Sequence, residues 1–271
     1  MEIKNHVLYD PDNTRITYSH TPNRSGLYVP KYLVMHYTAV TTMQSTVNWF
    51  QNPNAQASAH LLIGRDGAIH QFAPFNVVTW HAGRSSWRGL SGLNWHSIGI
   101  ELVNGGRLVR KGAKWVCPVD GRPVPDDNVV MAVHKNENQV AGWHEYTEQQ
   151  LEVSLHIASL LVNAYNLQDV LGHEDISPLR KSDPGPAFPM SSFRARAMGR
   201  RDETLDEYVT STDLNIRSGP GAGYSVLSRP LPAGTRVLSL KQEGNWSFVE
   251  VLDVVHGIMD LEGWVARKYL V

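Results

Sequence analysis

Three residues of metal-binding type stand far apart in this sequence, and together they suggest chemistry. His36 ends the apolar run 32–35, His173 lies well over a hundred residues later, and Asp183 stands in the proline-rich segment 181–186. Two imidazoles and one carboxylate leave a fourth position open on a tetrahedral zinc ion, and an open position distinguishes a catalytic zinc site from a structural one. If the three residues meet in space, the chain is predicted to be a zinc hydrolase.

Each of these residues taken alone has a simpler explanation. A histidine at the end of a buried strand is often held there by hydrogen bonds alone. An aspartate in a turn that contains Pro184 and Pro186 often caps that turn, because each proline fixes φ and discourages helix. The surrounding elements and motifs must therefore decide between chemistry and structure.

The composition excludes several classes of protein. With 42% hydrophobic and 19% charged residues, the 271-residue chain is typical of a soluble globular protein. A formal net charge of −1 gives no bulk attraction for nucleic acid or anionic lipid. The one cysteine, Cys117, excludes an intrachain disulfide, and no apolar run reaches the roughly 18 residues of a membrane span. We expect a monomer with no nucleic-acid partner and no membrane insertion.

A catalytic zinc site needs rigid elements, and the periodicity of the first two thirds of the chain predicts them. We expect a buried strand at 32–37 and a helix that starts after Thr41 or Thr42 and ends near Pro53. The Asp66-Gly67 turn predicts a hairpin over 59–72. A further strand is expected at 97–103.

A longer helix is predicted to follow Thr147, because Thr147 and Gln150 have capping-box spacing and apolar residues then recur at three- and four-residue steps as far as Tyr165. Strands mixed with helices predict an α/β domain over residues 1–195, with a mixed central sheet flanked by helices. Residues 104–146 lack clear periodicity, and we expect an irregular functional loop there.

The last quarter of the chain changes character. Residues 196–207, rich in arginine and then in acidic residues, are expected to be a helix end that runs into a linker. Residues 208–271 alternate short apolar runs with glycine-containing turns, which predicts a small all-β barrel.

Six stretches in order resemble the type 2 N-acetylmuramoyl-L-alanine amidases, a family that includes bacterial recycling amidases, phage lysozyme-amidases and animal peptidoglycan-recognition proteins. The resemblance covers about residues 30–190. The stretches are Val34-Met35-His36-Tyr37, Ser58 to Gly67, Trp80-His81-Ala82-Gly83, Ser97 to Glu101, Gly172-His173, and Lys181 to Pro186.

The resemblance implies that His36, His173 and Asp183 hold Zn²⁺, that Glu101 is the catalytic glutamate and that Lys181 is the catalytic lysine. These residue types suit amide hydrolysis. A carboxylate can take a proton from water and pass it to the leaving amine, and a fixed ammonium can stabilise an oxyanion.

The matching stretches also supply candidates for substrate binding: Tyr37, His60, Trp80 and His81. Two alternatives stay open among them. His81 either lines the cleft and contacts substrate or supports another residue of the site, and Trp80 either binds substrate or packs.

Two departures from the phage members point to a branch of the family. Phage relatives carry a catalytic tyrosine where Ala59 stands and a cysteine as the third zinc ligand, where this chain has Asp183. Ala59, Glu101 and Asp183 instead follow the bacterial recycling pattern. All three ligand positions are filled, which favours an active enzyme over the alternative, a non-catalytic peptidoglycan-binding protein of the same fold.

Residues 208–271 resemble bacterial SH3-like domains through Leu214 to Pro220, Gly244-Asn245-Trp246 and Gly263-Trp264-Val265. In cell-wall hydrolases such modules commonly bind peptidoglycan. Tethering an enzyme to a polymer raises its local concentration. The other interpretation is a module that packs on the catalytic domain and shapes its cleft.

The expected partner is therefore peptidoglycan or a muropeptide. Residues 1–6 lack the apolar core of a signal peptide. We expect the protein to act on the cell wall after release or non-standard export, as an endolysin-like enzyme does, rather than in cytoplasmic recycling.

Overall fold

The computed structural model describes residues 1–199, 207–258 and 261–271. The chain divides into two compact units, which we call the first and second units. The first unit comprises Met1–Val129 and Gly142–Gly185, and the second comprises Val130–Ala141 and Pro186–Val271. The expected domain boundaries at 195 and 208 stay predictions, and residues 200–206 of the expected linker lie outside the described residues.

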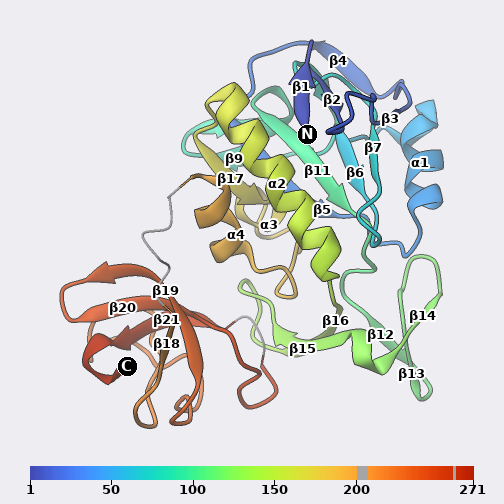
Figure 1. The fold of residues 1–271 in the computed structure, drawn as a ribbon. Helices are drawn as coiled ribbons and strands as arrows, with labels where there is room; N and C mark the ends of the chain where they lie inside the picture. The colour runs from blue at the N-terminus through green and yellow to red at the C-terminus, as the bar shows by residue number, and fades with distance from the viewer. Residues whose placement is uncertain (200–206, 259–260) are drawn as a thin grey trace. The chain divides into compact units, whose positions relative to one another are not determined.

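Six strands form the central sheet of the first unit: β3 (Thr17–Tyr18), β5 (Tyr32–Tyr37), β6 (Leu61–Ile63), β7 (Ile69–Gln71), β11 (Ser97–Leu102) and β17 (Asp169–Gly172). Their order is β17-β5-β11-β6-β7-β3 (Figure 1). Strand β5 runs parallel to β11 and β17, whereas β6 and β7 form the expected antiparallel hairpin. In this register Glu101 of β11 lies beside His36 of β5.

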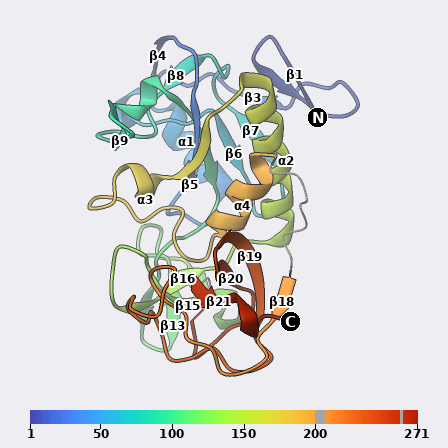
Figure 2. The ribbon, with the colours of Figure 1, turned by 90° about the vertical axis from the view of Figure 1, so that its left-hand side faces the viewer.

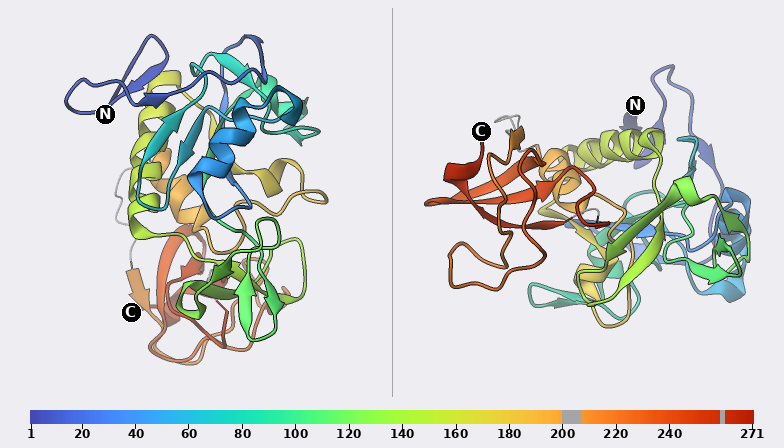
Figure 3. Two further views of the ribbon diagram at one scale, coloured as in Figure 1. Left: turned by 90° about the vertical axis from the view of Figure 1, so that its right-hand side faces the viewer. Right: turned by 90° about the horizontal axis from the view of Figure 1, so that it is seen from below.

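Two helices cover the opposite faces of this sheet (Figure 3). Helix α1 (Met43–Gln51) begins after Thr42, whose hydroxyl accepts a hydrogen bond from Ser45 N, and its Phe50 joins the core cluster with Leu62. Helix α2 (Glu148–Tyr165) begins after Thr147, as predicted. Its buried Gln150 donates to the carbonyls at the ends of β6 and β11, which fixes the helix across the sheet.

Shorter elements complete the first unit. The strands are β1 (Glu2–Lys4), β2 (Val7–Tyr9), β4 (Arg24–Leu27), β8 (Val77–Thr79), β9 (Ser86–Trp87) and β10 (Leu90–Ser91). The helical turns are η1 (Pro53–Ala55), η2 (Leu93–Trp95) and α3 (His173–Ile176). Helix α3 follows β17 without an intervening loop and lies close to β5 (Figure 2).

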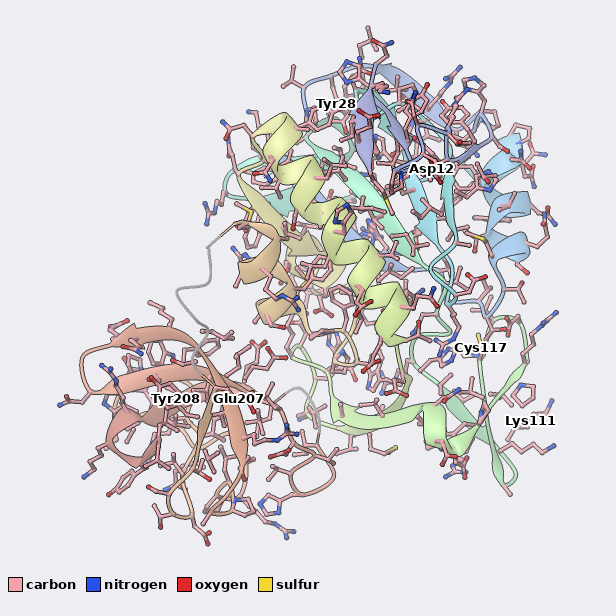
Figure 4. All side chains as sticks on the ribbon, in the orientation of Figure 1. Asp12, Tyr28, Lys111, Cys117, Glu207 and Tyr208 are labelled. Carbon is pink, nitrogen blue, oxygen red and sulfur yellow. The ribbon has the colours of Figure 1, made fainter. Side chains whose placement is uncertain are left out.

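The prediction of an irregular loop over 104–146 is wrong. The segment contains β12 (Val109–Lys111), β13 (Lys114–Val116), β14 (Pro123–Val124), η3 (Asp126–Asn128), β15 (Val129–Val133) and β16 (Val140–His144). Cys117 is buried in a small core with Leu108 and Val124, whereas Lys111 is exposed at the end of β12 (Figure 4). These strands are two to five residues long, too short for a period of two to stand out in the sequence.

The second unit contains a four-stranded antiparallel sheet in the order β18 (Glu207–Val209), β19 (Arg236–Glu243), β20 (Trp246–Val251) and β21 (Glu262–Ala266), followed by η4 (Arg267–Tyr269). One face carries a separate apolar core: Leu214, Ile216, Leu231, Val237, Val249, Val251, Val255 and Val265. Helix α4 (Met190–Ala197) also belongs to this unit. Among the helices of the described residues, none is long and apolar enough to cross a membrane.

The second unit buries one carboxyl group at a cost. Glu250 is 5% exposed, and its Oε2 atom has no hydrogen-bond partner within the described residues. Glu262 lies directly opposite it on β21. Burial, and then the charge of Glu262, raise the pKa of Glu250 to about 7 against a hydrogen bond from Ser192.

We expect Glu250→Gln to stabilise the protein at high pH. Below the ordinary glutamate pKa of about 4.5 both folded and unfolded states are protonated, so the native carboxyl carries no penalty. Between pH 4.5 and the folded pKa of about 7, the unfolded chain ionises this carboxyl while burial keeps the native one protonated, so the native protein loses stability relative to the glutamine variant, and the loss is complete above pH 7. The stability gain of the variant should grow from near zero at pH 4.5 to about 3 kcal/mol at pH 8.

Urea unfolding of the full chain, supported by hydrogen exchange of β20 amides, measures this difference. Native and variant chains are compared at the same pH, so the effect of pH on intrinsic exchange cancels. An equal difference at pH 5 and pH 8 would contradict the explanation.

Candidate metal centre and active site

The sheet topology brings the three predicted metal ligands together. His36 stands near the end of β5, and His173 opens α3 directly after the neighbouring parallel strand β17. Asp183 comes from the loop that follows α3. The two Nδ1 atoms lie 2.9 Å apart, and each is 2.9 Å from Asp183 Oδ2. All three side chains are buried.

The loop that carries Asp183 is held at three consecutive residues. Tyr37 and Ser182 share a hydrogen bond of 2.8 Å between their hydroxyl groups. Glu174 N donates to the Asp183 carbonyl at 2.9 Å, and Tyr146 Oη donates to the Pro184 carbonyl at 2.8 Å. These bonds fix the carboxylate relative to α3, so its position does not depend on a bound ion alone.

Gly172 lets this loop approach β17. A Cβ atom on Gly172 would lie 2.8 Å from Pro184 Cδ, closer than real Cβ atoms approach other heavy atoms. The glycine before His173 and the proline after Asp183 therefore fit against each other. This contact explains how two short motifs place His173 and Asp183, ten residues apart, next to each other.

The protonation states suit a metal. A carbonyl oxygen only accepts, so His173 Nε2, 3.1 Å from Ala82 O, carries the proton and leaves a lone pair on Nδ1. Burial and the neighbouring His173 lower the pKa of His36 to about 4, despite the opposing charge of Asp183. Burial alone would raise the pKa of Asp183, but the two neighbouring histidines hold it below its usual range. Neutral imidazole and carboxylate are the forms that bind metal ions.

The donor set fits a zinc ion. Three acceptor atoms that face each other at 2.9 Å repel unless a proton or a cation lies among them. Tetrahedral zinc with bonds of about 2.0–2.1 Å spaces its ligand atoms roughly 3.3 Å apart, so a small opening of the cluster would admit the ion. Among the described residues, His36, His173 and Asp183 form a group of three possible metal ligands whose donor atoms all lie within 4.8 Å of one another.

The two predicted catalytic residues face the same cavity, which encloses about 600 Å³. Glu101 is adjacent to His36 across the β5–β11 pairing, and its buried Oε2 atom has no hydrogen-bond partner among the described residues. Burial, and then the charge of Asp183, raise the pKa of Glu101 well above its ordinary value, opposed by the charge of Lys181. The other lining residues come mainly from α1, the β5 end and the loop 177–183.

The four predicted substrate-binding residues occupy different places. Tyr37, Trp80 and His81 line the cavity. His60 is fully buried and is not among the lining residues. Its Nδ1 atom accepts from Gly99 N at 3.0 Å, and its Nε2 atom donates to Val77 O at 2.9 Å, so the ring links neighbouring strands.

Sequence reasoning did not identify several further lining residues, among them Trp49, Val119 and Arg180. Trp49 of α1 is 53% exposed. It lies outside the buried face of the helix, and this position was the sequence signal that could have identified it as a lining residue. Val119 belongs to the segment interpreted as an irregular loop, where nothing in the sequence placed it. Asp120 beside it accepts hydrogen bonds from Thr41 N and Oγ1, both at 2.7 Å, which holds this loop at the cavity.

The close contact at Gly172 leads to a prediction. Gly172→Ala should push Pro184 away from β17 and shift the adjacent Asp183, which would weaken metal binding by roughly tenfold or more. Competition against a chromogenic chelator measures the affinity. Gly26→Ala is the matched control, because a Cβ there meets no atom closer than 3.9 Å. Native affinity in Gly172→Ala would show that this contact does not position the ligand.

More than half of this chain matches one known protein family. Residues 26–186 match the family described as N-acetylmuramoyl-L-alanine amidase, Amidase_2. The N-acetylmuramoyl-L-alanine amidase AmiD of Escherichia coli (strain K12) is 30% identical over 178 residues, which are 62% of this chain and 54% of AmiD. The 1,6-anhydro-N-acetylmuramyl-L-alanine amidase AmpD of Enterobacter cloacae is 32% identical over 150 residues, 55% of this chain and 61% of AmpD.

The chain thus spans a little over half the length of these curated relatives. A crystal structure of a selenomethionine AmpD derivative aligns with a TM-score of 0.50 and 25% identity, and covers 72% of this chain and 99% of that one. The predicted α/β fold with a mixed central sheet is confirmed. Because the family match extends over more than half of its residues, the chain belongs to the N-acetylmuramoyl-L-alanine amidase family.

Proposed function

We propose that this protein hydrolyses the amide bond between N-acetylmuramic acid and L-alanine in peptidoglycan or muropeptides. The observation that carries the proposal is that His36, His173 and Asp183 converge beside one cavity, which His173, Asp183 and Glu101 line. The names of the related proteins, all muramyl-L-alanine amidases, support the choice of bond. In this proposal the three converging residues hold Zn²⁺.

When bound, zinc supplies Lewis acidity and makes water a nucleophile near neutral pH. Glu101 has a buried carboxylate oxygen without a partner among the described residues, so it can accept the proton of the attacking water. Glu101 then delivers this proton to the nitrogen of L-alanine as the carbon–nitrogen bond breaks. The charge of Lys181 favours the ionised form of Glu101 and opposes the effect of burial on its pKa.

Lys181 and the aromatic lining residues complete the proposed mechanism. The Lys181 ammonium borders the same cavity and would stabilise the oxyanion that develops on the scissile carbonyl. Tyr37 and Trp80 are proposed to contact the substrate. The hydrogen bond between Tyr37 and Ser182 fixes the Tyr37 ring beside the loop that carries Asp183. The ring would therefore present a fixed surface to the substrate.

The direct test is digestion of purified peptidoglycan with zinc-loaded full-length protein. An amidase releases new amino termini of L-alanine and no new reducing sugar ends. New reducing ends without L-alanine termini would identify a glycosidase and overturn the proposal. Tight binding of muropeptide with no cleavage would favour a non-catalytic peptidoglycan-binding protein.

Glu101→Gln separates catalysis from metal binding. Glutamine keeps the shape of the side chain but cannot accept the proton, so turnover should fall by roughly 10²–10⁴-fold. Zinc content, measured by elemental analysis after gel filtration, should stay equal to that of the native protein. Loss of zinc in this variant would mean that Glu101 supports or ligates the metal instead.

We further propose that residues 1–195 form the amidase domain, that 196–207 connect the domains, and that 208–271 form a bacterial SH3-like domain that holds the enzyme on the cell wall. The face of the sheet opposite its core supports this role. Phe248 and Trp264 pair there across β20 and β21 with ring centroids 5.5 Å apart, and Lys241 lies over the Trp264 ring. An aromatic pair beside a cation offers stacking and polar contacts to a glycan or peptide.

Wall binding through this face can be measured without digestion in the Glu101→Gln background. Replacing both Phe248 and Trp264 by alanine should weaken co-sedimentation with insoluble peptidoglycan by about fivefold to tenfold. Hydrolysis of a soluble muropeptide by the same double replacement in the active enzyme should be unchanged. Trp95→Ala, which removes an exposed aromatic of the first unit, is the control. Unchanged sedimentation of the double variant would favour a packing role.

A further inference from the structure

A chain of hydrogen bonds leads from a backbone carbonyl through His81 to His36. His81 Nε2 lies 3.1 Å from Ser97 O, and His81 Nδ1 lies 2.9 Å from His36 Nε2. The opposite nitrogen of His36 is the one that faces His173 and Asp183. The ring planes of His36 and His81 are nearly perpendicular, at 81°.

The carbonyl at the start of this chain determines where each proton lies. Ser97 O can only accept, so His81 Nε2 must carry a hydrogen. His81 is 8% exposed, and burial disfavours a charged imidazolium, so the ring is neutral and its Nδ1 is an acceptor. His36 Nε2 must then be the donor to it. A neutral His36 is left with a bare lone pair on Nδ1, at the position where the three ligand atoms meet.

Ser97 O is itself held in place. It also accepts a hydrogen bond of 2.8 Å from the hydroxyl of Tyr28, which uses the second lone pair of the carbonyl. Ser97 is the first residue of β11 and pairs with Tyr32 of β5, the strand that carries His36. Both ends of the chain are therefore attached to the same pair of central strands.

Gly99 provides the space that His81 occupies. It lies on β11 on the same side of the sheet as Glu101, and a Cβ atom on it would be 2.5 Å from Cγ of His81 and 2.7 Å from Nδ1. Any other residue at this position would displace the imidazole from His36. A glycine two residues before Glu101 is thus explained by the histidine packed over it.

We propose that His81 is a positioning residue that fixes the tautomer and ring orientation of His36 for metal binding, and that Gly99 is required because the His81 ring fills its side-chain space. This inference rests on the proposed metal site and deepens it. It resolves the two interpretations of His81 in favour of support: His81 is 8% exposed, and both ring nitrogens are engaged within the protein.

The first test uses the native protein without metal. Long-range ¹H–¹⁵N NMR of the imidazole rings reports which nitrogen carries the proton. The proposal requires the Nε2–H tautomer for both His36 and His81. An Nδ1–H tautomer at either ring would overturn it, and no substitution is needed for this measurement.

The second test measures metal affinity by chelator competition. His81→Phe keeps a ring but removes the acceptor, so affinity should fall by about 10–100-fold. His81→Asn places an amide oxygen near the former Nδ1 and should recover part of the loss. His144→Phe is the control, because His144 is buried and bonded to Gly105 N but touches no ligand.

A double-mutant cycle links the glycine to the histidine. Gly99→Ala alone should weaken metal binding about as much as His81→Phe. In a His81→Ala background the clash is absent, so Gly99→Ala should have little further effect. Equal effects of Gly99→Ala in both backgrounds would show that Gly99 acts independently of His81 and would overturn this part of the proposal.

The outcomes separate this inference from the proposed function. Native metal affinity in His81→Phe with a raised KM for muropeptide would make His81 a substrate contact and overturn the inference, while amidase activity would stand. Conversely, absence of amidase activity in the native protein would leave the tautomer and affinity measurements interpretable, because neither uses a substrate.

Discussion

The site depends on placing three electron-pair donors within 2.9 Å of one another in a buried position. Left alone, two imidazole lone pairs and a carboxylate repel, so the protein must hold them by other contacts. It does so with β5 and β17 in parallel register and with backbone and tyrosine hydrogen bonds to the loop 182–184. The far nitrogen of His173 faces the Ala82 carbonyl, and that of His36 faces the His81 ring. A cation removes the repulsion, which is why this arrangement favours a metal.

The same constraint explains the residues around the site. Small residues stand where two segments approach closely: Gly172 against Pro184 and Gly99 against His81. Glu101 lies next to His36 because the strands that carry them pair in parallel. Its Oε2 atom is buried without a hydrogen-bond partner among the described residues, which is costly for folding. His36 and Glu101 of the candidate site therefore stand on central strands of the first unit, while Trp49 lines the cavity from α1 and Val119 from the loop between β13 and β14.

Much of the first unit could be predicted from sequence, for physical reasons. The apolar run before His36, the Asp66-Gly67 turn and the cap at Thr147 are strong local signals, and the corresponding elements form as expected. The metal ligands needed a further step, because no local pattern joins His36 to Asp183, and the family motifs provided it. The strands within 104–146 could not be predicted because they are short and depend on a small core around Cys117. The position of His60 away from the cavity depends on tertiary packing that its motif does not reveal.

The central claim is that His36, His173 and Asp183 bind one metal ion, with both histidines using Nδ1. Anomalous diffraction at the zinc absorption edge from crystals of the zinc-loaded full chain tests it most directly. The account predicts one strong peak within bonding distance of His36 Nδ1, His173 Nδ1 and an Asp183 carboxylate oxygen. A peak bound through Nε2 of either histidine, or no peak at these residues, would contradict it.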